Sequence, residues 1–234
     1  MPYRNLLTLM IERLWANTHE DREGYPDSAA FLADLDLISS SLHAHGGMHA
    51  GAHAVQRVRR RVECFGFHLA TLDLRQDSGT HDAALAALLD DAEWDARPAV
   101  ERAARLHALL EQQRPSVPRP EAAPAANTLA VFRTVAALRP RYGARAFGPY
   151  IISMSRTAAD ALAVLALARV AGCADAEGNV PLDVAPLFET VDDLDASAAT
   201  LSALFADPVY RAHLAARGNR QLVMLGYSDS AKDG

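Results

Sequence analysis

The feature that most limits how this chain can fold is the alternation of short apolar runs with amphipathic segments in its second half. The apolar runs lie at 148–154, 183–188 and 221–226, and their length and composition are typical of buried strands. The segments with helical periodicity lie at 157–171, 192–205 and 208–217. Strands that alternate with helices pair in parallel, because each helix returns the chain to the end of the sheet at which the previous strand began. The sequence therefore predicts an α/β fold.

The first half of the chain is mostly helical in pattern. One further buried strand is predicted at 67–74. The predicted helices lie at 4–17, 28–43, 53–64, 80–90, 98–112 and 127–139. We interpret the stretch His43–His53, rich in glycine and histidine, as a loop, and the proline-rich segment 114–125 as a solvated connector.

Polar residues follow the predicted strands. In (β/α)₈ barrels the active site lies at the carboxyl ends of the strands. Four strands are too few to close a barrel of eight, so we expect a helix-rich, partial (β/α)₈ barrel with extra helices. On this interpretation residues 1–234 form an incomplete portion of one barrel domain, cut at both ends. Such a half-barrel is expected to expose apolar surface and an unpaired sheet edge, and to be poorly soluble or oligomeric.

Composition excludes several classes of protein. A formal net charge of −6 gives no basic surface for nucleic acid or anionic membranes. No apolar run is long enough to span a bilayer, and the polar start lacks the apolar core of a signal peptide. The only two cysteines, Cys64 and Cys173, are interpreted as buried thiols. A cytoplasmic location is therefore expected.

Two carboxylates follow neighbouring predicted strands. Glu189 follows the strand at 183–188 and Asp229 follows the strand at 221–226. Parallel pairing would bring both to one rim, where Mg²⁺ or Mn²⁺ prefers oxygen ligands. The alternative is that each acid only caps the helix after its strand.

Two cations lie near the same predicted strand ends. Arg75 could grip a phosphate or carboxylate through paired hydrogen bonds, or could merely pair with Asp73 or Asp77. Lys232 could hold an anionic substrate, or could be a solvated loop lysine. The histidines of His43–His53 are not expected to bind zinc, because no acid or cysteine lies among them and glycines interrupt the segment.

Four stretches, in this order, resemble phosphoenolpyruvate carboxylase. The most specific is Leu-Gly-Tyr-Ser-Asp-Ser-Ala-Lys-Asp-Gly at the end of the chain, and Pro2-Tyr3-Arg4 resembles the family's Glu-Pro-Tyr-Arg. The four stretches are Arg60–Ser78, Tyr150–Val164, Val184–Leu194 and Val223–Gly234. The resemblance therefore runs over essentially the whole chain.

This resemblance implies a (β/α)₈ barrel enzyme, assembled as a homotetramer, that carboxylates phosphoenolpyruvate with bicarbonate to give oxaloacetate and phosphate. It implies Mg²⁺ or Mn²⁺ as cofactor, with Glu189 and Asp229 as metal ligands. It also implies that Arg75 lies near the substrate phosphate and that Lys232 lies near the bicarbonate. No nucleic-acid or membrane partner is implied.

Two motifs of the family are missing from this sequence. The family's catalytic histidine motif and its Gly-Arg-Gly-Gly loop do not occur in these residues. We therefore expect the chain alone to be inactive. Two alternatives stay open at this point: a small metal-dependent α/β lyase, and a non-catalytic helical binding module.

Overall fold

The computed structural model describes residues 2–19 and 23–226. The chain divides into two compact units. One comprises Met1–Thr71 with Arg139–Ala146, and the other comprises Leu72–Leu138 with Phe147–Gly234. Each unit has its own hydrophobic core, and each is described by itself below.

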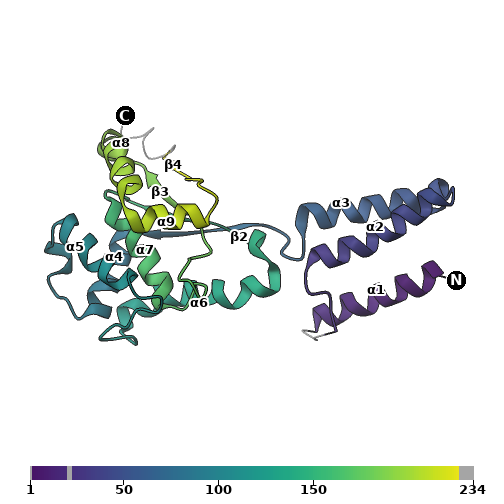
Figure 1. Cartoon of the computed structure of the whole chain (residues 1–234), viewed down its shortest axis with the longest axis horizontal. Helices are drawn as coiled ribbons and strands as arrows, with labels where there is room; N and C mark the ends of the chain where they lie inside the picture. Colours follow the sequence, from purple (N-terminus) through teal and green to yellow (C-terminus); the bar gives the residue numbers. More distant parts are fainter. Residues whose placement is uncertain (1, 20–22, 227–234) are drawn as a thin grey trace. The chain divides into compact units, whose positions relative to one another are not determined.

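The first unit is helical, and the helices from its first 71 residues are seen in purple and blue in Figure 1. Its long helices are α1 (Pro2–Thr18), α2 (Ser28–Ala44) and α3 (His53–Phe65), with short turns η1 (Met48–Ala52) and η3 (Ala144–Ala146). Asp27 caps α2 by accepting a hydrogen bond from the Ala30 amide at 2.8 Å. The core residues are Met10, Tyr25, Phe31, Leu35, Ile38, Leu42, Ala52 and Val62.

Two predictions about this unit were wrong. His43–His53 is not one loop, because α2 continues to Ala44 and η1 leads directly into α3. Gly51 has φ of 100°, so it produces a kink between two helical turns and not a long irregular segment. Cys64 is exposed, since it lies two residues, or about 200° of helix, beyond buried Val62. Cys173, in the second unit, is buried as predicted.

The second unit contains a four-stranded parallel sheet, so the predicted α/β class is confirmed. Its strands are β1 (Leu72–Asp77), β2 (Phe147–Ser153), β3 (Val184–Phe188) and β4 (Met224–Leu225), in the order β1-β2-β3-β4. The helices are α4 (Ser78–Leu89), α5 (Ala99–Leu110), α6 (Ala123–Tyr142), α7 (Ala158–Val170), α8 (Val191–Ala206) and α9 (Pro208–Ala216), with the short turn η2 (Trp94–Ala96).

Alternate residues of the strands face two different environments. Tyr150, Ile152 and Val184 belong to the main core, which they share with residues of α4 to α9. Ile151 and Ala185, one position along, belong to a separate small cluster with Leu187 on the other face. Helices gathered on one face of a parallel sheet are what a partial (β/α)₈ barrel requires. Figure 1 shows α4, α5, α6 and α7 grouped together on the sheet unit.

The first strand starts later than the sequence predicted. It runs over Leu72–Asp77 and not over 67–74. Phe67 instead packs against the core of the helical unit, and Leu69 turns the chain with φ of 66°. The strand itself is largely polar and exposed, so a search for an apolar run selects the segment before it.

The proline-rich connector was predicted too long at its carboxyl end. The helix α6 already begins at Ala123, and Ala125 is fully buried in the core. Pro124 is tolerated because the first turn of a helix has no partner for that N–H in any case. Residues 114–122 remain outside any helix or strand, as expected for a connector.

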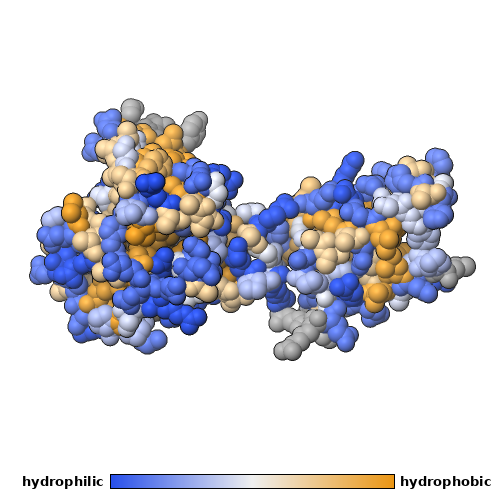
Figure 2. Space-filling view, in the orientation of Figure 1, coloured by the Kyte–Doolittle hydropathy of each residue, from blue (hydrophilic) through white to orange (hydrophobic). Residues whose placement is uncertain are grey.

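Apolar side chains remain at the surface of both units. Figure 2 shows such residues in orange between the hydrophilic ones. At the two edge strands of the described sheet, Leu72 is 66% and Leu225 is 62% exposed. These exposed leucines agree with the expectation of an uncovered sheet edge. None of the helices within the described residues combines the length and hydropathy that crossing a membrane requires.

Candidate active site

The centre of the site is Glu189, which directly follows β3. Its side chain is only 9% exposed. One carboxylate oxygen, Oε1, accepts a hydrogen bond from the Met154 amide at 3.1 Å, and Oε2 accepts one from the Arg75 guanidinium at 3.3 Å. A buried carboxylate is stable when it is paired and hydrogen-bonded in this way.

Arg75 reaches Glu189 from a segment 114 residues away in the sequence. Its Nε donates to the Ser153 hydroxyl at 2.8 Å, and one terminal nitrogen donates to Glu189. The pairing of β1 with β2 aligns Arg75 with Ile151, and the pairing of β2 with β3 aligns Ile151 with Ala185. Arg75 therefore projects from the sheet face that carries the small cluster, and its side chain is 51% exposed. The guanidinium is thus both held in place and accessible to an anion.

The alternative roles considered for these two residues were a helix cap for Glu189 and an ion pair with an aspartate of its own strand for Arg75. The structure contains neither. Thr190, not Glu189, caps α8, and it does so in a capping box with Asp193. Asp77 caps α4 by accepting from the Gly79 amide at 2.8 Å. Among the described residues, the ion pair of Arg75 is with Glu189 and not with Asp73 or Asp77.

A network of hydrogen bonds between polar side chains lies under this end of the sheet. The Tyr150 hydroxyl donates to Gln76 Oε1 at 2.9 Å, and Gln76 Nε2 donates to the Thr128 hydroxyl at 3.3 Å. His81 Nε2 lies 2.8 Å from the same tyrosine oxygen. Since the tyrosine proton goes to Gln76, the histidine must donate from Nε2, which leaves Nδ1 buried as an acceptor without a partner. Burial lowers the pKa of His81 to about 4, so this ring is neutral.

Gly226 closes the site from the side of β4. Its amide donates to the Phe188 carbonyl at 2.8 Å. A Cβ at this position would lie 2.7 Å from both Cα and Cβ of Glu189, closer than real Cβ atoms come to other atoms. Only glycine therefore allows the chain to pass this close to the carboxylate residue.

Gly226→Ala is expected to destabilise the sheet unit by about 1–3 kcal/mol, because overpacking must push β4 away from Glu189. Urea unfolding would measure this change in the free energy of unfolding. Gly172→Ala reports positive-φ strain without crowding, since its φ is 78° and nothing lies within 4 Å of a Cβ there. A loss of less than about 0.5 kcal/mol in Gly226→Ala would mean that crowding against Glu189 contributes nothing.

The remaining predicted site residues, Asp229 and Lys232, lie outside the described residues. Within residues 2–19 and 23–226, no group of three or more acidic, histidine or cysteine side chains is arranged to hold a metal ion. Glu189 and Arg75 are therefore the two predicted residues that the structure brings together.

Sequence reasoning missed three residues of the site. Ser153 could have been noticed as a polar residue ending an apolar strand, and Gly226 as a glycine at the end of the last strand. Met154 gives no such signal. It has φ of 55°, a conformation that favours glycine or asparagine over methionine.

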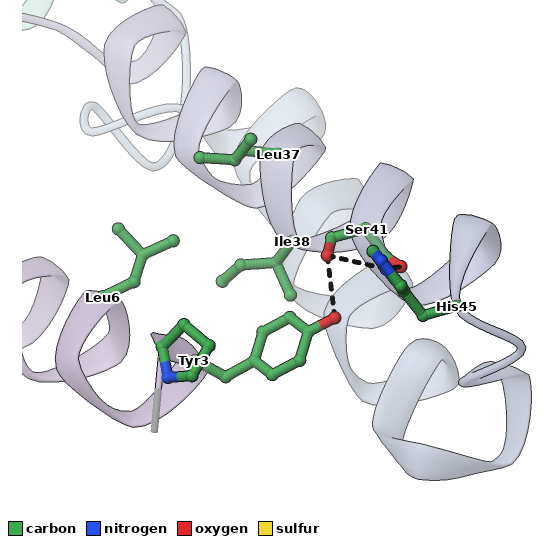
Figure 3. Close-up of a pocket in the computed structure, with 7 residues that line it drawn as sticks. Tyr3, Leu6, Leu37, Ile38, Ser41 and His45 are labelled. Carbon is green, nitrogen blue, oxygen red and sulfur yellow. Dashed lines mark hydrogen bonds between the residues drawn. The ribbon is translucent and has the colours of Figure 1, made fainter.

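A cavity lies in the helical unit, between α1 and α2 (Figure 3). It has a volume of about 400 Å³ and is lined mainly by Leu6, Leu37 and Ile38. At its polar end the Tyr3 hydroxyl lies 2.8 Å from the Ser41 hydroxyl. This apolar groove contains none of the predicted catalytic or metal-binding residues.

The chain is similar to known proteins over its whole length. The family profile described as phosphoenolpyruvate carboxylase matches residues 3–234. The phosphoenolpyruvate carboxylase of Xanthomonas euvesicatoria pv. vesicatoria is 53% identical over 235 residues, which cover 100% of this chain and 26% of that protein. The one from Mycobacterium avium is 40% identical over 254 residues, which cover 100% of this chain and 27% of that protein.

A third relative, the phosphoenolpyruvate carboxylase of Azorhizobium caulinodans, is 41% identical over 224 residues, covering 90% of this chain and 23% of that protein. The chain thus spans about a quarter of the length of these curated relatives. The match extends over both the helical unit and the sheet unit with its Arg75–Glu189 pair. This 234-residue chain therefore belongs to the phosphoenolpyruvate carboxylase family.

Proposed function

We propose that this chain supplies part of the active site of a phosphoenolpyruvate carboxylase, which converts phosphoenolpyruvate and bicarbonate to oxaloacetate and phosphate. The observation that carries the proposal is the meeting of Arg75 and Glu189 at the carboxyl end of the parallel sheet. Catalytic groups of (β/α)₈ barrels come from the ends of different strands in this way.

The residues present fit a divalent cation. Glu189 offers carboxylate oxygens, which Mg²⁺ and Mn²⁺ prefer, and Asp229 is proposed as the second ligand. The only ion pair of Glu189 among the described contacts is with the half-exposed Arg75, and a bound cation would take over the role of that positive charge. When bound, such an ion would neutralise phosphate charge and stabilise the enolate oxygen.

The protein's own cations have a separate role in this proposal. Arg75 binds the phosphate of phosphoenolpyruvate through its planar guanidinium, while Lys232 holds the bicarbonate. A bicarbonate oxygen attacks phosphorus, the bond from phosphorus to the enol oxygen breaks, and the enolate of pyruvate leaves. The resulting carboxyphosphate releases phosphate and carbon dioxide, and the enolate carbon attacks the carbon dioxide to form oxaloacetate.

The complete activity requires more residues than these. We propose that residues 1–234 form an incomplete portion of the barrel domain and that the chain alone is inactive, since it contains no Gly-Arg-Gly-Gly loop. The full-length enzyme is proposed to be a cytoplasmic homotetramer without nucleic-acid or membrane partners. This proposal follows from the family resemblance and from a net charge of −6.

Calorimetric titration of Mn²⁺ into the 234-residue chain tests the metal site. We expect binding in the wild type and none in a Glu189→Gln/Asp229→Asn double variant, because both proposed carboxylate ligands are then lost. Mg²⁺ should compete with Mn²⁺ for the same site.

The control is Glu177→Gln, which removes an exposed carboxylate from the loop before β3. It should bind Mn²⁺ like the wild type. If the double variant of a folded chain still binds as tightly, Glu189 and Asp229 are not the ligands.

A further inference from the structure

Both charged groups of the site are held by two consecutive residues at the end of β2. The Ser153 hydroxyl accepts from Arg75 Nε at 2.8 Å, and the Met154 amide donates to Glu189 Oε1 at 3.1 Å. These contacts join three strands, because Arg75 lies on β1 and Glu189 follows β3. The end of β2 therefore contacts both charged side chains, Arg75 and Glu189.

The geometry of Met154 is unusual for its residue type. Its φ of 55° lies in the left-handed region, which methionine rarely adopts. The Ser78 hydroxyl at the start of α4 donates to the Met154 carbonyl at 2.8 Å. This bond holds the peptide on one side of Met154 while Glu189 holds the amide on the other. A strained residue that persists at a functional site does so because its surroundings fix it.

We propose that Ser153 and Met154 are positioning residues for the carboxylase reaction. Ser153 fixes the plane of the Arg75 guanidinium, so that the terminal nitrogens face the substrate phosphate. The left-handed turn at Met154 directs its amide at Oε1 and so fixes the orientation of the Glu189 carboxylate, which accepts from Arg75 at Oε2 and would be available to hold a metal ion. This inference rests on the proposed function, but the orientation of Arg75 can be measured without metal or substrate.

The Arg75 Nε–H signal in the NMR spectrum of the 234-residue chain reports the Ser153 contact. In Ser153→Ala we expect this proton to exchange with water about tenfold faster, as for the loss of one hydrogen bond to a charged group. Ser202→Ala is the control, because among the described residues its hydroxyl bonds to the Ala198 carbonyl within α8, away from Arg75. Unchanged exchange at Arg75 in Ser153→Ala would overturn the role of Ser153.

For Met154 the readout is Mn²⁺ affinity measured by calorimetry. Met154→Val should weaken binding about tenfold, since a β-branched residue resists positive φ and the amide turns away from Glu189. Met154→Asn is the conservative variant and should restore affinity to within about threefold of wild type, because asparagine tolerates this conformation. Equal affinities in the valine and wild-type chains would overturn the role of Met154.

The same variants separate this inference from the proposed function. Wild-type chain that binds no Mn²⁺ would contradict the proposed metal site, while the Arg75 exchange measurement would still decide whether Ser153 positions the arginine. In the full-length carboxylase, Ser153→Ala should raise KM for phosphoenolpyruvate about tenfold with a smaller change in kcat. A loss of thermal stability with unchanged KM would identify Ser153 as structural only.

Discussion

Replacing Glu189 with glutamine in the full-length carboxylase that carries this segment is expected to lower kcat at least about 10³-fold. The substitution keeps the shape of the side chain and its acceptor for the Met154 amide, but it removes the negative charge. A metal ion bound through a neutral amide would be held weakly and misplaced, so the charge that develops on the enolate would be left without its counter-ion.

Activity would be followed through the bicarbonate-dependent formation of oxaloacetate, coupled to its reduction by NADH. Glu177→Gln serves as the matched control, since Glu177 lies exposed in the loop before β3 and its carboxylate has no role in the site. A Glu189→Gln enzyme with more than about a tenth of the wild-type kcat would contradict the assignment of Glu189 as a metal ligand.

Lowering the pH from 7 to 5 should destabilise the sheet unit strongly. Burial lowers the pKa of His81 to about 4, and burial together with the charge of Arg217 lowers the pKa of His213 to about 4. The unfolded chain then binds more protons than the folded one between about pH 6.5 and pH 4. Stability therefore falls as the pH is lowered through this window, by about 2 kcal/mol for each histidine between pH 7 and pH 5.

The groups around each ring set the size of this effect. Asp77 and Asp82 raise the pKa of His81 slightly, whereas Arg169 adds to the lowering at His213, where Asp183 opposes it. Buried Asp160 acts in the opposite direction, because burial raises its pKa and its protonation at low pH favours the folded state.

Trp94 provides the probe for this measurement. It is buried in the sheet unit, and its indole nitrogen donates to Asp82 at 2.8 Å. The other tryptophan, Trp15, is 60% exposed on α1, so a Trp15→Phe background leaves a fluorescence signal from the sheet unit alone. Urea unfolding of this background at pH 7 and pH 5 gives the two free energies.

Substituting the histidines tests the cause. His81→Gln and His213→Gln should each reduce the loss of stability between pH 7 and pH 5 by about 2 kcal/mol, whatever they do to stability at pH 7. The control is His53→Gln, an exposed residue of the helical unit. A pH dependence that is unchanged in both buried-histidine variants would show that other groups carry it.

The sequence predicted the part of the site that depends on strand direction. The proximity of Glu189 and Arg75 was predicted from one rule, that parallel strands have their carboxyl ends at the same end of the sheet. The strands β2 and β3 were placed within a residue of their bounds, because their apolar runs are uninterrupted. The capping boxes at Thr157 and Thr190 are local features of the structure, since all their hydrogen bonds lie within four residues.

What the sequence did not predict depends on contacts between distant residues. Strand β1 is recognisable only through its pairing with β2, because its own residues are largely polar and exposed. The left-handed conformation of Met154 arises from Ser78 and Glu189, which lie 76 and 35 residues away. Propensity at one position cannot report such constraints.

The order of the strands in the sheet has a consequence for how the chain folds as it is synthesised. Because the spatial order β1-β2-β3-β4 is also the order of synthesis, each strand emerges next to one that already exists. Once β1 and β2 have paired, β3 and β4 each add to a strand that is already made, so the sheet can grow vectorially on the ribosome. The slow step is expected between β1 and β2, since Asp77 and Phe147 enclose the longest crossover in the sheet. During that interval β1 is an unpaired edge, and its polar residues, Arg75 among them, protect the nascent chain from aggregation.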